Sequence, residues 1–194
     1  MRQRIQDIRR RELIEATRAV IEERGFEHLT VADIARKAGF SNGYLHHHFR
    51  SKNDLLAETM RVLYADMRSF IAANMSPDID ARGRLAVIVD ANFREEQFSR
   101  ENASIWISYL ARVRFEPDFI RLQSIIQRRL RSNLLHELKC LASPDLAEEI
   151  CSELSSLIDG LWVRLAVDPN GFSSGAAKQV INIYLSRILG RVAD

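Results

Sequence analysis

The sequence predicts an all-α protein of about nine helices. Only four prolines and eight glycines occur in 194 residues, so few positions interrupt a helix. Apolar residues recur three and four positions apart along most of the chain, and the alternating β-branched runs that would indicate strands are missing. Apolar residues make up 46% and charged residues 28% of the chain, which is ordinary for a globular protein and excludes disorder as its main state.

The expected helices begin and end at recognisable capping and breaking residues. Gly25 is expected to end the first helix as a left-handed C-terminal residue, and Gly39 is expected to end the second helix. Thr30, with Asp33 three residues later, has the pattern of a capping box, and Ser41 is suited to cap the third helix. The expected helices cover residues 8–24, 31–38, 42–49, 53–74, 82–98, 102–114, 117–140, 143–167 and 174–190.

Positive charge is concentrated in the first of two expected domains. We expect an N-terminal module over residues 1–52 and a helical C-terminal domain over residues 53–194. Residues 1–60 hold 11 Lys and Arg against 9 Asp and Glu, whereas residues 61–194 hold 17 of each. The first eleven residues set five arginines against one acid: Arg2, Arg4, Arg9, Arg10 and Arg11 against Asp7. A basic arm and an ordinary solvated helix face both explain this run.

Composition and segment lengths also predict where the protein works. No apolar run reaches the roughly 18–20 residues of a membrane span, and the N-terminal stretch lacks the apolar core of a signal peptide. The two cysteines, Cys140 and Cys151, have neither metal-ligand spacing nor a disulfide framework, and are expected to be packing residues. We therefore expect a cytoplasmic protein with no membrane partner.

Two short helices joined by Ala38-Gly39-Phe40-Ser41 have the dimensions of a homeodomain-like helix-turn-helix, in which the second helix enters the major groove of DNA. Four residues are expected to pack inside the module: Ile34, Ala35, Leu45 and Phe49. Five are expected to face outward: Asn42, Tyr44, His46, His47 and His48. An asparagine can pair bidentately with adenine, while Ser41 and Lys52, near helix N-termini, suit phosphate oxygens.

The stretch from Leu29 to Leu56 reads LTVADIARKAGFSNGYLHHHFRSKNDLL and resembles the TetR family of bacterial transcriptional regulators. The family pattern is T-x-x-x-I-A-x-x-A-G-x-S-x-G-x-L-Y-x-H-F-x-x-K-x-x-L. His46 stands where the family usually has Tyr. The resemblance implies that the DNA backbone is bound by Ser41, His46, His48 and Lys52. It implies that the groove is read or lined by Asn42, Tyr44 and His47. Thr30 and Gly43 also match the pattern and complete the expected DNA-binding set.

The three adjacent histidines are not expected to bind a metal. Successive helical residues point about 100° apart, so the imidazoles of His46, His47 and His48 cannot converge on one ion, and the i, i+4 spacing of helical zinc ligands is missing. The chain also contains no nucleophile elbow, phosphate loop or dinucleotide-binding glycine pattern. We therefore expect no enzyme, no metal site and no cofactor.

The last two helices carry wide apolar stripes that two arrangements explain. One stripe includes Leu154, Ile158 and Leu161, and the other includes Ile181, Tyr184 and Ile188. The stripes suit either a core within one chain or a four-helix bundle made with a second copy. Gly160, inside a strong helical pattern, hints at a close helix approach. The TetR resemblance favours the homodimer, since members of that family generally dimerise through their two C-terminal helices.

Aromatic residues of the C-terminal domain point to a ligand site. Rings of Phe93, Trp106, Tyr109 and Trp162, together with the carboxylate of Asp159, would suit a quaternary ammonium ion, although each ring taken singly is also explained as core. Beyond the helix-turn-helix, the chain resembles the choline-responsive BetI-type repressor branch of the TetR family. The residues that carry this resemblance include Asn92-Phe93 with Gln97, Trp106, and Leu157-Ile158-Asp159-Gly160-Leu161-Trp162. The resemblance brings Gln97 into the expected ligand set and implies choline or a related cationic compound.

These observations together predict a sequence-specific, DNA-binding transcriptional regulator. We expect a homodimeric repressor that leaves a palindromic operator when a small-molecule inducer binds, because only different affinities for two states can release DNA. Two alternatives stay open. One is a helical small-molecule-binding protein or enzyme with a vestigial DNA-binding module, and the other is an activator of the same architecture.

Overall fold

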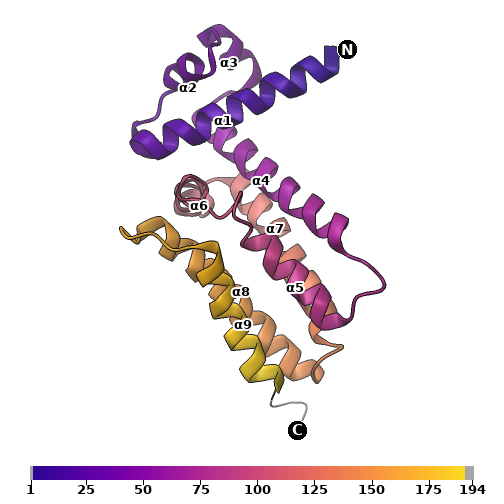
Figure 1. Cartoon of the computed structure of the whole chain (residues 1–194). Helices are drawn as coiled ribbons and strands as arrows, with labels where there is room; N and C mark the ends of the chain where they lie inside the picture. The colour runs from indigo at the N-terminus through magenta and orange to yellow at the C-terminus, as the bar shows by residue number, and fades with distance from the viewer. Residues whose placement is uncertain (1, 191–194) are drawn as a thin grey trace. The chain divides into compact units, whose positions relative to one another are not determined.

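The computed structural model describes residues 2–190, with side chains from residue 8 onward, and most of these residues are helical (Figure 1). The helices are α1 (Arg2–His28), α2 (Val31–Ala38), α3 (Asn42–His48), α4 (Lys52–Asn74), α5 (Ala81–Asn92), α6 (Arg100–Val113), α7 (Pro117–Leu138), α8 (Pro144–Val167) and α9 (Ser174–Gly190). These are nine helices, and no strand occurs among the described residues. The predicted all-α class is confirmed.

The chain folds into two compact units, each made of separate stretches. Unit 1 takes residues 1–63 and 100–122, and unit 2 takes residues 64–99 and those from 123 onward. Helices α4 and α7 therefore each contribute to both units. This division differs from the expected boundary after residue 52, because α6 returns to unit 1 and packs against α1.

The core of unit 1 lies beneath the two short helices. Ile34 and Ala35 on α2, Leu45 on α3 and Phe49 just after it are all buried. These are the four residues expected to pack inside the module. Because Ile34 and Leu45 are fully inaccessible to solvent, the underside of the helix pair is fixed by apolar packing.

The corner between α2 and α3 depends on the backbone of Gly39. Its φ of 72° and ψ of 24° lie in the left-handed region, which costs a residue with a Cβ about 1–2 kcal/mol. The amide of Gly39 donates to the Arg36 carbonyl at 3.3 Å, and the amide of Phe40 donates to the Ala35 carbonyl at 2.9 Å. These bonds close α2, and the predicted stop at Gly39 is confirmed.

The end of α1 differs in detail from the prediction. The helix continues to His28, but Gly25 interrupts it with φ 72° and ψ 158°. The positive φ agrees with the predicted break, whereas the extended ψ is not left-handed helical. The chain changes direction there, and Phe26 turns back into the core, where it is buried.

Helix α2 begins at the predicted capping box. The Thr30 hydroxyl accepts a hydrogen bond from the Asp33 amide at 3.1 Å, and the Asp33 carboxylate accepts from the Thr30 amide at 3.2 Å and from the Thr30 hydroxyl at 2.6 Å. The bond from the Thr30 hydroxyl, followed by the Thr30 amide and the charges of Arg24 and Arg36, lowers the pKa of Asp33. The carboxylate form therefore stabilises the start of the helix.

In unit 2, the helix predicted over residues 82–98 ends early. Helix α5 stops at Asn92, and turns follow up to Ser99. The Phe93 carbonyl accepts a hydrogen bond from the Ser174 hydroxyl of α9, and the Phe93 ring is fully buried. In a longer helix, the Phe93 carbonyl would accept a hydrogen bond from an amide one turn later. Here it accepts one from Ser174, 81 residues away in the sequence.

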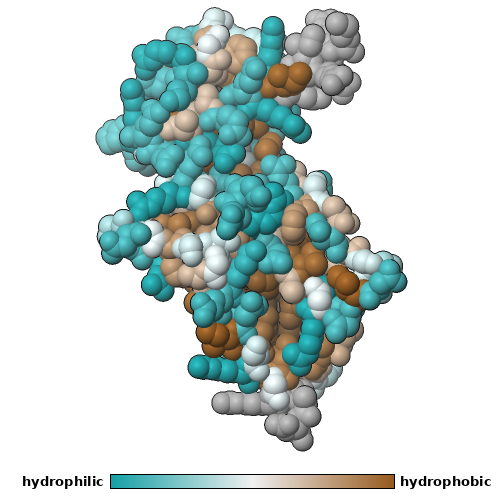
Figure 2. Space-filling view, in the orientation of Figure 1, coloured by the Kyte–Doolittle hydropathy of each residue, from teal (hydrophilic) through white to brown (hydrophobic). Residues whose placement is uncertain are grey.

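Hydrophilic side chains cover much of the face shown in Figure 2, with hydrophobic side chains exposed between them. The exposed large hydrophobic residues occur in both units: Ile8, Phe115 and Ile120 in unit 1, and Val163, Val167 and Ile183 in unit 2. Within the described residues, every helix is too short or too polar to cross a membrane.

Gly39→Ala is expected to lower the free energy of unfolding of unit 1 by about 1–2 kcal/mol. The cost comes from the backbone alone, since no atom lies within 4 Å of an added Cβ. Urea denaturation followed by circular dichroism measures it. The matched control is Gly43→Ala, whose Cβ also meets open space but which lies inside α3, where alanine is favoured over glycine by up to about 1 kcal/mol. Equal destabilisation by both substitutions would contradict this account of the corner.

Acid is expected to weaken the start of α2. Because the pKa of Asp33 is lowered in the folded chain, its contribution to stability is present above the usual carboxyl range and is lost as the pH falls through the lowered pKa. Asp33→Asn should therefore reduce the melting temperature at neutral pH, and the difference from the unaltered protein should shrink in acid. Thermal melts across that pH range check this, and a difference independent of pH would argue against it.

Candidate functional site

The outer side of α3 carries an exposed row of polar side chains. Asn42, His46, His47 and His48 are exposed, whereas Leu45 between them is buried. This is the arrangement that the sequence predicted. Helix α3 is therefore held by one apolar residue and presents an amide and three imidazoles to its surroundings, groups that hydrogen-bond to phosphates and base edges.

Tyr44 is half-buried and lies in a group of ring contacts. Its ring stacks on Phe40, with centroids 4.9 Å apart, and contacts His48 at 4.5 Å. The Arg9 guanidinium lies over the same ring, 5.6 Å from its centroid. Sequence reasoning missed these contacts of Phe40 and Arg9, although the i, i+4 spacing of Phe40, Tyr44 and His48 was a signal for part of the group.

The hydroxyls of Ser41 and Thr30, both predicted to contact DNA, differ in whether their hydrogen is free to donate. The Ser41 hydroxyl accepts from the Tyr44 amide at 3.2 Å, which leaves its own hydrogen to donate. The Thr30 hydroxyl donates to the Asp33 carboxylate, so a bond from it to a phosphate would replace that bond, while the two bonds of the capping box could remain. Gly43 is exposed inside α3, where its Cβ position is open to solvent or a ligand.

Lys52 is held by the end of α1 rather than extended into solvent. Its ammonium donates to the carbonyls of Phe26 at 3.3 Å and Glu27 at 3.1 Å, and lies 4.9 Å from the centroid of the Phe26 ring. The Arg112 guanidinium of α6 lies 4.1 Å from the same centroid. Lys52 therefore fixes the beginning of α4 against α1 within unit 1, a role that the motif alone did not reveal.

The basic arm divides into separate environments. Arg9 lies over Tyr44, while Arg10 forms an ion pair with the buried Glu58 at 2.5 Å. The side chains of Arg2 and Arg4, which belong to the same predicted arm, lie outside the described residues. Among the described residues, no group of three His, Cys, Asp or Glu side chains gathers as metal ligands do.

Four of the six expected ligand residues lie in unit 2. Phe93 and Trp162 each contact Phe98 edge-on, at 5.2 Å and 5.0 Å between centroids, and Gln97 is half-buried in the turn after α5. Desolvation raises the pKa of Asp159, although the side chain keeps solvent-accessible surface. Asp159 is exposed on α8.

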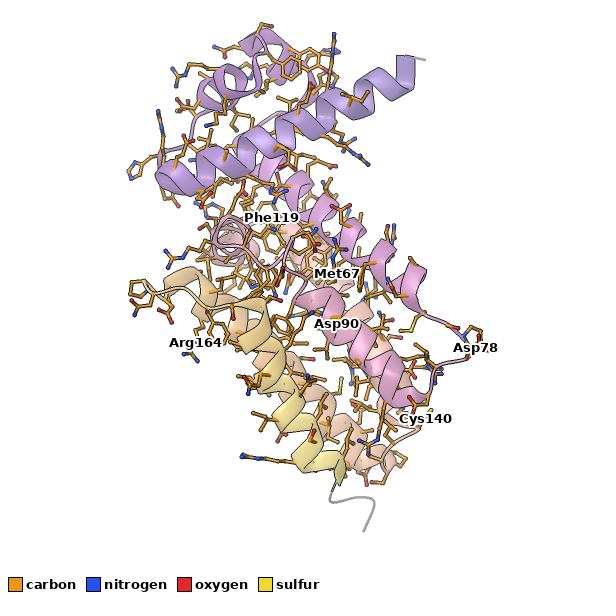
Figure 3. All side chains as sticks on the ribbon, viewed as in Figure 1. Met67, Asp78, Asp90, Phe119, Cys140 and Arg164 are labelled. Atoms are coloured by element: carbon orange, nitrogen blue, oxygen red, sulfur yellow. The ribbon has the colours of Figure 1, made fainter. Side chains whose placement is uncertain are left out.

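The other two expected ligand residues lie in unit 1. Trp106 stacks on Tyr109 with centroids 5.9 Å apart, and Tyr109 contacts Phe119 with centroids 5.0 Å apart. Phe119 is labelled in Figure 3. Tyr109 is fully buried, and its hydroxyl donates to the Phe119 carbonyl at 3.0 Å. Burial raises the pKa of Tyr109 to about 12. The ring is thus part of the core, and its hydroxyl is already used.

Most of the expected interface residues are covered within one chain. Leu154, Ile158, Leu161 and Ile181 are buried within the chain, so these four residues contribute to its core. Tyr184 and Ile188 are half-buried, and the Tyr184 hydroxyl donates to the Glu153 carboxylate. Among the described residues, no other side chain lies within 4 Å of an added Cβ on Gly160, so the hinted close helix approach does not occur between them.

The exposed faces of α8 and α9 carry other apolar residues. Val163, Val167 and Ile183 are 39%, 69% and 45% exposed. A groove of about 520 Å³ follows the outer face of α9, lined by residues that include Gln179, Ile183 and Ser186. Sequence reasoning missed these residues, because a stripe shows which side of a helix is apolar and not which neighbour covers it.

Comparisons with known proteins agree with this geometry. Residues 13–59 match the family model described as bacterial regulatory proteins of the tetR family, and residues 81–190 match the BetI-type transcriptional repressor C-terminal domain. The chain is 38% identical over 192 residues to the HTH-type transcriptional regulator BetI of Proteus mirabilis (strain HI4320), covering 98% of this chain and 96% of that protein. It is 37% identical over 187 residues to BetI of Klebsiella pneumoniae (strain 342), covering 95% and 96%.

Solved structures show the same fold. A transcriptional regulator from Saccharomonospora viridis, solved in complex with choline, is 26% identical with a TM-score of 0.79, covering 91% of this chain and 95% of that one. A regulator from Pseudomonas aeruginosa PAO1 is 27% identical with a TM-score of 0.78, covering 95% and 92%. The chain therefore belongs to the TetR family of bacterial transcriptional regulators and carries the C-terminal domain of its BetI-type repressors.

Proposed function

We propose that the chain is a homodimeric repressor that binds a palindromic operator through α3 and leaves it when a choline-like cation binds in unit 2. The observation that carries this proposal is the construction of α3. Leu45 buries its underside, while Asn42 and three histidines stay exposed on its outer side. A short helix built in this way can enter the major groove without disturbing the core beneath it.

The proposed DNA contacts follow from the donors and acceptors that each side chain does not use within the chain. Asn42, Tyr44 and His47 contact base edges, and Ser41, His46 and His48 donate to phosphates. Thr30 supports α2 through its capping box. Lys52 acts mainly by holding α4 to α1, because two of its donors point at the carbonyls of Phe26 and Glu27.

The aromatic residues of unit 2 suit a quaternary ammonium ion. Trp162 lies three residues after Asp159, so both side chains lie on one side of α8, and the Trp162 ring packs on Phe98. Ring faces attract a cation that cannot donate conventional hydrogen bonds. The desolvation that raises the pKa of Asp159 disfavours its ionised form, and a bound cation would favour that form again. The choline complex of the related Saccharomonospora viridis regulator supports a ligand of this class.

A path from the ligand to α4 exists within unit 2. Arg94, in the turn between Phe93 and Phe98, places its guanidinium 4.7 Å from the centroid of the Phe70 ring on α4. Helix α4 is continuous from Lys52 to Asn74. A ligand that repositions the turn would therefore move one end of a helix whose other end anchors the DNA-binding unit. It releases DNA only if it binds more tightly to the form whose recognition helices no longer match successive grooves.

Mobility-shift titration of the full-length protein against the DNA upstream of its own gene tests this function. We expect a specific complex that choline at millimolar concentration dissociates. Trp162→Ala should weaken choline binding by roughly 2–30-fold, because a cation–π contact contributes about 0.5–2 kcal/mol, and should leave DNA binding without choline intact. Calorimetry measures the ligand affinity. Val163→Ala, the next residue along α8, is the control, and no heat with choline would remove the ligand assignment.

The second copy is expected to cover the exposed apolar residues of α8 and α9. Ile183→Glu should convert the dimer to a monomer in sedimentation velocity, because it introduces a charge where burial would require an apolar side chain. Ile8→Glu is the matched control, since Ile8 is 51% exposed on α1 of unit 1, and it should leave the dimer intact. A dimer that survives Ile183→Glu would rule out this face.

A further inference from the structure

Three consecutive arginines on α1 have three different surroundings. Arg9 lies with its guanidinium over the ring of Tyr44, 5.6 Å from the centroid. Arg10 is paired with Glu58 of α4 at 2.5 Å. Arg11 is exposed and has no ion pair with residues 8–190. The three arginines therefore differ in their contacts, although they form one basic run in the sequence.

Tyr44, whose ring lies under Arg9, is the least polar of the side chains on the outer side of α3. Phe40 stacks on it with an interplanar angle of 22°, and His48 contacts it with the two rings tilted by 52°. These partners leave Tyr44 half-buried. A side chain held by several ring contacts has few accessible rotamers, and each contact removed from the group restores some of its freedom.

We propose that Arg9 is a specificity-determining residue that acts through Tyr44. Its guanidinium holds the Tyr44 ring in the orientation in which that ring meets base edges, so Arg9 sets which operators are preferred. This inference rests on the proposed role of α3 in the major groove. A planar guanidinium suits the task, because it stacks flat on an aromatic face where an ammonium acts only as a point charge.

A positioning arginine and a phosphate-binding arginine leave different traces in binding data. Loss of a phosphate contact weakens binding to all sequences alike. It also reduces the magnitude of the slope of log K against log salt concentration by about 1. Loss of a residue that orients Tyr44 changes the ratio of affinities between operators instead. Arg11 supplies the comparison, since it belongs to the same helix and lacks the aromatic partner.

The experiment selects binding sites from a randomised duplex library with the full-length protein and then measures affinities for the selected site and its single-base variants. Arg9→Ala should reduce discrimination by roughly 2–5-fold at the positions where Tyr44→Ala reduces it, which is the size expected for an exposed cation–π contact. Adding Arg9→Ala to Tyr44→Ala should change nothing further. Arg9→Lys should retain the salt dependence and recover only part of the discrimination. Arg11→Ala should weaken every duplex equally.

The results separate this inference from the function on which it rests. If Arg9→Ala weakens all duplexes alike, or adds its full effect to Tyr44→Ala, Arg9 contacts the phosphates itself and the inference is wrong while the regulator stands. If the unaltered protein selects no sequence, both are overturned. Equal melting temperatures of the Arg9→Ala and Arg11→Ala proteins exclude altered folding as the cause of any difference between them.

Discussion

The rest of unit 1 depends on the apolar contact beneath the corner of the two short helices. Ile34 and Ala35 from α2 meet Leu45 from α3 in a core closed to solvent, and the left-handed backbone of Gly39 makes the turn that brings them together. Because the side chains on the outer face are mostly free of this packing, their chemistry can serve DNA without cost to the fold. Tyr44 is the exception, since it is half-buried and belongs both to the packed side and to the outer side of α3.

A second constraint joins the DNA-binding helices to the remainder of the chain. The Phe26 ring has two cations near it, Lys52 from α4 and Arg112 from α6. Arg112 also pairs with Glu27, and Asn53 donates to Glu116 at 2.7 Å. The end of α1 is therefore tied to the beginning of α4 and to the segment at the end of α6. Helix α4 itself continues into unit 2.

Local signals in the sequence predicted much of this arrangement, and distant partners account for the rest. The capping box at Thr30, the stop at Gly39 and the bounds of α9 depend on residues a few positions apart, and each agrees with the structure. Helix α5 ends earlier than predicted, and the Phe93 carbonyl after it accepts a hydrogen bond from Ser174, far along the chain. Lys52 matched its motif, but its partners lie 25 and 26 residues away. A pattern identifies a residue type at a position and leaves its long-range partner undetermined.

Helix α8 carries buried core residues together with the residues proposed above to contact the ligand and the second copy. Leu154, Ile158 and Leu161 fill the core of unit 2, so the apolar stripe of the sequence is accounted for within one chain. Gly160 is different, because no described residue outside its own helix backbone would contact a Cβ added there. A glycine inside a helix nevertheless costs about 1 kcal/mol relative to alanine. A second copy approaching α8 closely would explain it. Asp159 directly precedes Gly160, so in the proposed dimer a cation bound at Asp159 would lie within one helical turn of the proposed contact.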